Sequence, residues 1–204
     1  MEEKNLTGSE SLHLIQQMIR VAKEEFYENG DGWLTWGWLL FGASVTSMAL
    51  DWTKNWEYIG LVWLGMLGIG LLIMLGSYLT GKSRRLARGS AKTYVQEMLN
   101  RFSIGFFISL FVMIAATFMS QAGNPGFTFG YYYVLYAFWM FIHGSALRFK
   151  PLIMGALVNW IAAIAIFKIE VFMYDMLVSA VAVLVGYLIP GYMLRAKYRK
   201  AKKL

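Results

Sequence analysis

Residues 58–80, YIGLVWLGMLGIGLLIMLGSYLT, form a run without a charged side chain, and the basic segment GKSRRLARGSAK follows it at 81–92. A bilayer core about 30 Å thick needs roughly 20 apolar residues of helix to cross it. Only a helix or a closed barrel satisfies its own backbone hydrogen bonds where no water is present. The run therefore predicts a membrane-spanning helix that ends at a positively charged surface.

Five more segments of the same kind lie before and after this run. Together they predict an all-α integral membrane bundle of six transmembrane helices, near 33–50, 58–80, 102–120, 129–147, 152–167 and 176–194. The composition agrees, since 58% of the 204 residues are hydrophobic and 15% are charged. Soluble domains average roughly 45–50% and about 25%.

The distribution of Lys and Arg predicts how the chain is oriented. If the N-terminus is cytoplasmic, seventeen of the nineteen basic residues fall on the cytoplasmic side, and only Lys54 and Lys168 fall outside. Basic residues near span ends favour the cytoplasm, so we expect an N-in/C-in orientation. The transmembrane domain then covers 31–194 and a basic cytoplasmic tail covers 195–204. No basic and then apolar leader opens the chain, so we expect the spans themselves to direct insertion.

The first thirty residues differ from the spans. Thr7 and Glu10 have the spacing of a capping box, and Asn29-Gly30 is a helix stop signal. Apolar residues recur on one helical face at Leu12, Ile15, Ile19, Ala22 and Phe26. We expect residues 1–30 to form an amphipathic helix that lies on the cytoplasmic surface or packs against a partner.

The cytoplasmic loops carry basic residues that orient spans, hold lipid or dock a protein. Each Lys or Arg near the surface contributes about 1 kcal/mol of attraction to anionic lipid. We expect contacts with anionic head groups or a cytoplasmic protein at Arg84, Arg85, Arg88, Lys92, Arg148 and Lys150. Nucleic acid is not an expected partner, because the net charge of +7 is clustered beside apolar spans.

Enzymatic and metal chemistry find no support. The chain has no cysteine, so thiolate catalysis and thiolate metal sites are excluded. His13 and His143 are its two histidines, without a carboxylate pair at ligand spacing. No GxSxG, HExxH or Walker pattern occurs. We expect neither an enzyme nor a bound cofactor or metal.

One polar pocket can be proposed within the spans. All twelve acids fall in loops, tails or span ends, which leaves His143 as the titratable group, tyrosines aside, within a span. Such groups are usually functional in transporters, but we expect a neutral His143 that hydrogen-bonds to another helix rather than a proton carrier. Asn159 and Tyr187, close to the kink-prone Pro190, are the polar groups that would line a small pocket with His143.

Small and aromatic residues leave two further questions open. Gly60, Gly65, Gly68, Gly70 and Gly76, like Gly155, Ala163, Ala182 and Gly186, permit close helix contacts, within the bundle or in a homo-oligomer. The tyrosines at 131, 132, 133 and 136 open the fourth span from the outside. They are typical of an interfacial aromatic belt, or they form a patch on which a ligand stacks.

Three segments carry a resemblance to a known group. ESLHLIQQMIRVAK at 10–23, GWLTWGWLLFGAS at 32–44 and LRFKPLIMG at 147–155 resemble uncharacterised small multi-pass membrane proteins of Bacteroidota. The likeness extends over most of the chain and implies a bacterial inner-membrane location. It implies no activity and no site residue.

These observations favour a non-enzymatic accessory, sensor or scaffold protein whose cytoplasmic face binds lipid or a partner. The alternative is a small-solute transporter that uses the pocket at His143, Asn159 and Tyr187. An intramembrane enzyme is disfavoured, because no candidate nucleophile has a base beside it.

Overall fold

The structure is a computed structural model that describes residues 29–88, 94–120, 125–169 and 171–201, with single helical positions at 8, 12 and 16. The amphipathic helix expected at 1–30 therefore lies almost entirely outside the described residues, as does Lys92. For Arg84, Arg85 and Arg88 only the backbone is described.

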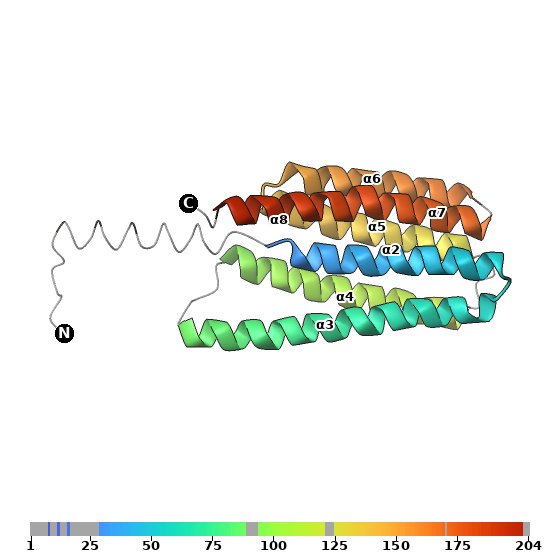
Figure 1. Ribbon diagram of the computed structural model, residues 1–204, viewed down its shortest axis with the longest axis horizontal. Coiled ribbons are helices and arrows are strands. Elements are labelled where there is room, and N and C mark those ends of the chain that lie inside the picture. Colours follow the sequence, from blue (N-terminus) through green and yellow to red (C-terminus); the bar gives the residue numbers. More distant parts are fainter. Residues whose placement is uncertain are drawn as a thin grey trace.

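Six helical rods lie side by side in the described residues (Figure 1). Five of them are α2 (Asp31–Trp52), α3 (Ile59–Arg88), α4 (Tyr94–Ser120), α5 (Pro125–Ala146) and α6 (Lys150–Lys168). The sixth runs without a break through α7 (Phe172–Val183), the π-helical turn η2 (Leu184–Leu188) and α8 (Ile189–Ala201). A short 3-10 helix, η1 (Trp56–Tyr58), precedes α3. No strand occurs in these residues, so the predicted all-α class is confirmed.

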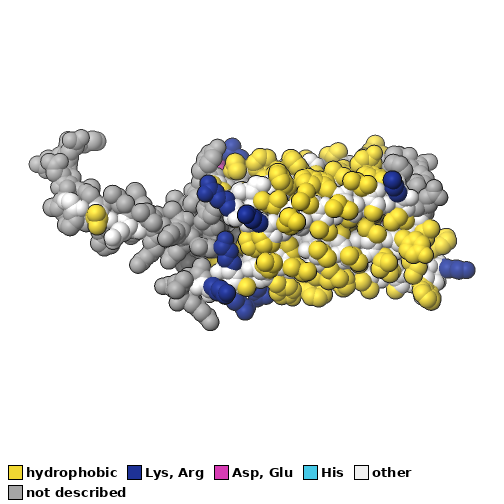
Figure 2. Space-filling model, turned by 90° about the horizontal axis from the view of Figure 1, so that it is seen from above, with side chains coloured by type: hydrophobic (Ala, Val, Ile, Leu, Met, Phe, Trp, Pro, Cys, Tyr) yellow, Lys and Arg dark blue, Asp and Glu magenta, His cyan; other side chains and the backbone are white. Residues whose placement is uncertain are grey.

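Four helical stretches are long and apolar enough to cross a membrane. They are Trp56–Thr80, Glu97–Thr117, Lys150–Lys168 and Phe172–Lys200. Large apolar side chains stand exposed on them, such as Leu72 (70% exposed), Phe111 (72%) and Ile161 (68%), and hydrophobic side chains cover the bundle between its ends (Figure 2). An apolar surface this extensive indicates a membrane protein.

The two remaining rods, α2 and α5, occupy the interior of the bundle. Each has 22 residues, which gives a length of about 33 Å at 1.5 Å per residue. α2 packs against α3, α7 and α8, and α5 packs against α4, α6 and α7. Both are rich in Trp, Tyr, Gly and Ser, and several of these side chains are buried, among them Trp33, Ser44, Ser47, Tyr133 and Tyr136. Their lower hydropathy therefore fits their place inside the bundle.

The two ends of the bundle differ in charge. One end, which we call the basic end, carries the described side chains of Arg101, Arg148, Lys150, Arg195, Lys197, Arg199 and Lys200 (Figure 2). The turn between α5 and α6 lies at this end. The turns at 53–55 and 169–171 lie at the opposite end (Figure 1), whose described cations are Lys54 and Lys168.

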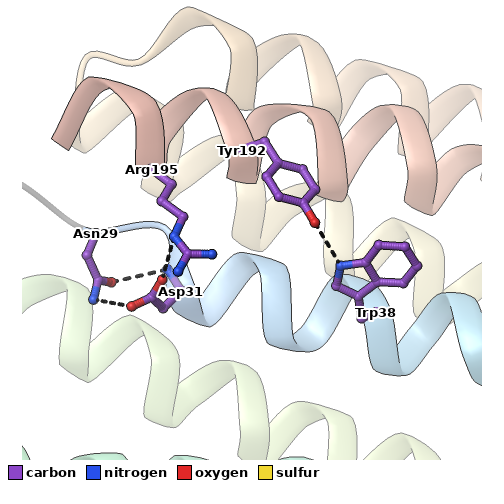
Figure 3. A network of polar contacts seen from close by, with 5 residues as sticks. All are labelled: Asn29, Asp31, Trp38, Tyr192 and Arg195. Atoms are coloured by element: carbon purple, nitrogen blue, oxygen red, sulfur yellow. Dashed lines mark hydrogen bonds and ion pairs between the residues drawn. The ribbon is translucent and has the colours of Figure 1, made fainter. Parts of the chain in front are cut away.

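Polar contacts join the start of α2 to α8 at the basic end (Figure 3). The Asn29 side chain accepts from the backbone N–H of Asp31 at 3.1 Å and donates to its carboxylate at 2.7 Å. Arg195 Nε lies 3.5 Å from the same carboxylate. Trp38 Nε1 donates to the Tyr192 hydroxyl at 3.3 Å. Because the ion pair is exposed, it contributes only about 0–1 kcal/mol, and the contacts chiefly fix the helix positions.

The predicted spans coincide with the helices, but the helices extend further. α5 begins at Pro125, four residues before the expected start, because proline is favoured at the first helical position. α3 continues to Arg88 and α8 to Ala201, well past the apolar runs. Hydropathy marks the apolar part of a helix, and hydrogen bonding continues where charged side chains reach water.

The closest approach of two backbones joins α6 to the turn η2. A methyl group at Gly155 would collide with the carbonyl oxygen of Gly186, and one at Gly186 would collide with the Asn159 amide. Pro190, four residues after Gly186, cannot donate to that carbonyl in the α-helical pattern. A π-helical turn precedes the proline, and such turns accommodate an interrupted ladder.

The glycines of the second span behave differently from these two. Only Gly70 packs closely, since a methyl group there would lie 2.5 Å from the Trp36 ring. Nothing lies within 4 Å of the corresponding position at Gly60, Gly65, Gly68 or Gly76. Among the described residues, these four glycines therefore do not bring α3 against another helix of the chain.

Gly186→Ala is expected to lower the stability of the protein. Its methyl group has to displace the Asn159 amide, and overpacking of this kind costs about 1–3 kcal/mol. Thermal unfolding in detergent measures the effect, with Gly68→Ala as the matched control because its new methyl group meets nothing. Equal unfolding temperatures for the two variants would contradict the packing described.

Candidate functional site

His143 lies near the basic end of α5 and is 5% exposed. Its Nδ1 is 2.9 Å from the backbone carbonyl oxygen of Trp139, and its Nε2 is 3.4 Å from the Ser103 hydroxyl on α4. A carbonyl oxygen only accepts, so Nδ1 carries the proton and Nε2 accepts from Ser103. The Trp139 indole also donates to Ser103, at 3.4 Å. This is the geometry of a neutral imidazole that joins α5 to α4.

Asn159 and Tyr187 are buried in different surroundings. The Asn159 amide nitrogen donates to the Gly155 carbonyl oxygen at 2.8 Å and approaches the Met140 sulfur at 3.5 Å. The Tyr187 hydroxyl and the Asn159 carbonyl oxygen have no hydrogen-bond partner among the described residues. Ring contacts link Tyr187 to His143 through Trp33, whose centroid lies 5.7 and 5.6 Å from theirs. The three predicted pocket residues thus belong to a packed interior, with the Trp33 ring between two of them.

Of the predicted lipid or partner contacts, Arg148 and Lys150 are described. They lie in and after the turn between α5 and α6, where Arg148 has a φ of 49° and the Phe149 N–H donates to the Gly144 carbonyl oxygen at 2.8 Å. The Lys197 ammonium on α8 lies 5.6 Å from the centre of the Phe149 ring. Cations from two rods therefore gather around this turn.

A cavity of about 610 Å³ lies in the half of the bundle away from the basic end. Its lining residues come from α2, η1, α3, α4, α5 and α7, and none of His143, Asn159 and Tyr187 is among them. Pockets that enclose small ligands typically measure about 300–1,000 Å³ and are mostly apolar with a few polar groups. This cavity has both properties and is the best candidate for a ligand site.

Aromatic rings form much of the cavity wall. Trp63 and Phe129 lie across from each other with ring centres 5.1 Å apart, and Phe172 stands 5.8 Å from Phe129. Tyr132, Tyr133 and Tyr136 also line the cavity, whereas Tyr131 faces outward and is 53% exposed. Three of the four tyrosines thus have positions suited to stacking on a ligand, and the fourth has a position typical of an interfacial belt.

Polar lining groups gather toward the opposite end of the bundle. Asp51, in the last turn of α2, is the single charged residue among those that line the cavity. Thr128 lies in the first turns of α5, and Thr117 lies near the end of α4 with its hydroxyl 3.3 Å from that of Tyr132. Leu40, Met66 and Leu110, all buried, line the cavity toward the middle of the bundle. The cavity therefore changes from polar to apolar along the bundle axis.

The wall of the cavity is incomplete between α3 and α4. Both helices contribute lining residues, yet no described Cα atom of α3 lies within 8 Å of one in α4. α3 is held by α2 and η1, and α4 is held by α5. The cavity can thus be reached from the side of the bundle.

A second group of buried polar residues lies where α2 packs on α7. Asp175 is 1% exposed in the first turn of α7, although the sequence places it in a loop. One carboxylate oxygen of Asp175 and the hydroxyls of Ser47 and Ser179 have no hydrogen-bond partner among the described residues. Tyr133 donates to the backbone carbonyl oxygen of Ser179 at 3.1 Å. The spacing of Asp175 and Ser179, one helical turn apart, is a signal that sequence reasoning could have used.

Other chemistry finds no site in the part of the chain that is described. No group of three or more His, Cys, Asp or Glu side chains there could hold a metal ion. The chain matches no protein-family model, no curated protein and no solved structure.

A double-mutant cycle tests whether His143 joins two helices. Ser103→Ala and His143→Phe should be coupled by about 0.6 kcal/mol, the average for hydrogen bonds between membrane helices. Unfolding of both single variants and the double variant in mixed micelles measures the coupling. His143→Phe with Thr80→Val is the control pair, because Thr80 bonds only its own helix and distant sites are additive. Additive effects at Ser103 and His143 would contradict the assignment.

Proposed function

We propose that the protein is a six-span bacterial inner-membrane protein, with the basic end, the N-terminus and the C-terminus in the cytoplasm. We further propose a non-enzymatic accessory, sensor or scaffold role, in which the cytoplasmic face binds anionic lipid head groups and a protein partner. The charge difference between the two ends supports both parts of the proposal.

The observation that carries the proposal is the cluster of cations at the basic end. Among the described residues its two acids, Asp31 and Glu97, are each paired with an arginine, Arg195 and Arg101. The remaining cations, Arg148, Lys150, Lys197, Arg199 and Lys200, form no ion pair within the described residues. At about 1 kcal/mol each near an anionic surface, five such cations favour binding of anionic head groups.

The interior supports a binding role over transport of a polar solute. His143, Asn159 and Tyr187 are buried against tryptophan, methionine and glycine, so they do not line the large cavity. That cavity is lined mainly by apolar and aromatic side chains. A polar solute needs convergent polar groups along its path, and the described interior offers few of them.

The double variant Arg148→Gln/Lys150→Gln tests the proposed lipid binding. Removal of two cations is expected to reduce the retention of phosphatidylglycerol about thirtyfold, from about 1 kcal/mol per charge, while retention of phosphatidylcholine stays the same. Native mass spectrometry of the full chain, released from detergent with defined lipid mixtures, measures both.

Lys54→Gln/Lys168→Gln is the matched control, since it removes two cations from the opposite end. It should leave the retention of phosphatidylglycerol unchanged. If both double variants lose it equally, the basic end is not a specific site for anionic lipid.

A further inference from the structure

We propose that the cavity binds one acyl chain of an amine-headed phospholipid, which enters from the bilayer between α3 and α4 and places its ammonium group beside Asp51. The inference concerns the opposite half of the bundle, so it does not depend on anionic lipid binding at the basic end.

The inner part of the cavity suits a hydrocarbon chain. Leu40, Met66, Leu67, Leu110 and Ile114 line it together with aromatic rings. Apolar side chains gain little from water in such a space, and apolar cavities do not hold ordered water well. A flexible chain from the surrounding lipid can fill it without loss of hydrogen bonds.

The side opening identifies the bilayer as the source of the occupant. The gap lies between α3 and α4, whose neighbouring surfaces expose Leu61, Leu64, Phe111 and Val112. Both helices belong to the long apolar stretches that can cross a membrane. An acyl chain beside these helices can therefore move sideways into the cavity and keep its apolar surroundings.

The charge at the mouth of the cavity identifies the head group. Asp51 is half-buried and forms no ion pair among the described residues, although Lys54 lies three positions further along the chain. It stands near the C-terminus of α2, where the helix dipole is negative and favours a cation. Trp56, Trp63 and Phe129 line the cavity with it. A carboxylate beside aromatic faces is suited to an ammonium group, and an anionic head group is disfavoured there.

Fluorescence quenching by a lipid with brominated acyl chains tests the inference on the full-length protein in detergent. At near-stoichiometric brominated phosphatidylethanolamine, we expect quenching of tryptophan emission that unlabelled phosphatidylethanolamine reverses and phosphatidylglycerol reverses about fivefold less well, as for one charge near a surface. Trp63→Phe should remove much of the quenched signal. Trp38→Phe, on the outer surface beside Tyr192, should not.

Two matched pairs of variants separate the head group from the chain. Asp51→Asn should weaken binding of phosphatidylethanolamine about fivefold, whereas Glu57→Gln, an exposed acid outside the cavity, should not. Gly60→Leu adds a side chain at a lining position with open space around it and should reduce quenching. Gly68→Leu, also open but outside the cavity, should leave quenching unchanged.

Three results would overturn the inference. The first is equal competition by phosphatidylethanolamine and phosphatidylglycerol. The second is an equal effect of the two members of either variant pair. The third is that dodecyltrimethylammonium reverses the quenching better than phosphatidylethanolamine, which would assign the cavity to a dispersed cationic amphiphile.

Discussion

Hydrocarbon offers no hydrogen-bond partner to a peptide group, and the described part of this protein is organised around that constraint. Helices satisfy their backbone internally, and cations stay at the ends of the rods. Association between rods cannot draw on the hydrophobic effect, because lipid tails are as apolar as the side chains they replace. It depends on close packing, most clearly where Gly155 and Gly186 bring α6 against η2. Pro190 helps to define that contact, since it interrupts the regular helix directly after η2.

The two halves of the bundle are packed differently. Toward the basic end, Trp139 contacts Trp33, Phe106 and His143 with ring centres 4.6, 4.8 and 4.7 Å apart. These rings fill the space between α2, α4 and α5. In the other half α3 and α4 separate, and the cavity occupies the space between them. A rigid half that holds the helices in place and a hollow half that is open to the bilayer suit a protein that binds a lipid rather than one that moves a polar solute.

Hydropathy predicts the helices well, because a run that must lie in hydrocarbon has no alternative structure. It does not predict their ends, since α5 starts at Pro125 and α3 continues to Arg88 for reasons unrelated to hydropathy. The candidate site is harder. His143 and Asn159 are recognisable as buried polar residues, but their separate surroundings depend on how distant helices pack. The tyrosines of the fourth span are noticed from the sequence, whereas Asp51, Trp63 and Phe129 join them only through the fold. Asp175 is assigned to a loop because it precedes an apolar run, yet α7 already includes it.

The account depends most on the threading of the chain, and site-directed labelling tests this directly. The sequence contains no cysteine, so single cysteines can be introduced in place of Lys54, Arg148 and Lys200 and treated with a membrane-impermeant maleimide. The account predicts that positions 148 and 200 react only when the reagent reaches the cytoplasm, and that position 54 reacts from outside. Labelling of positions 148 and 200 from opposite sides of the membrane would contradict it.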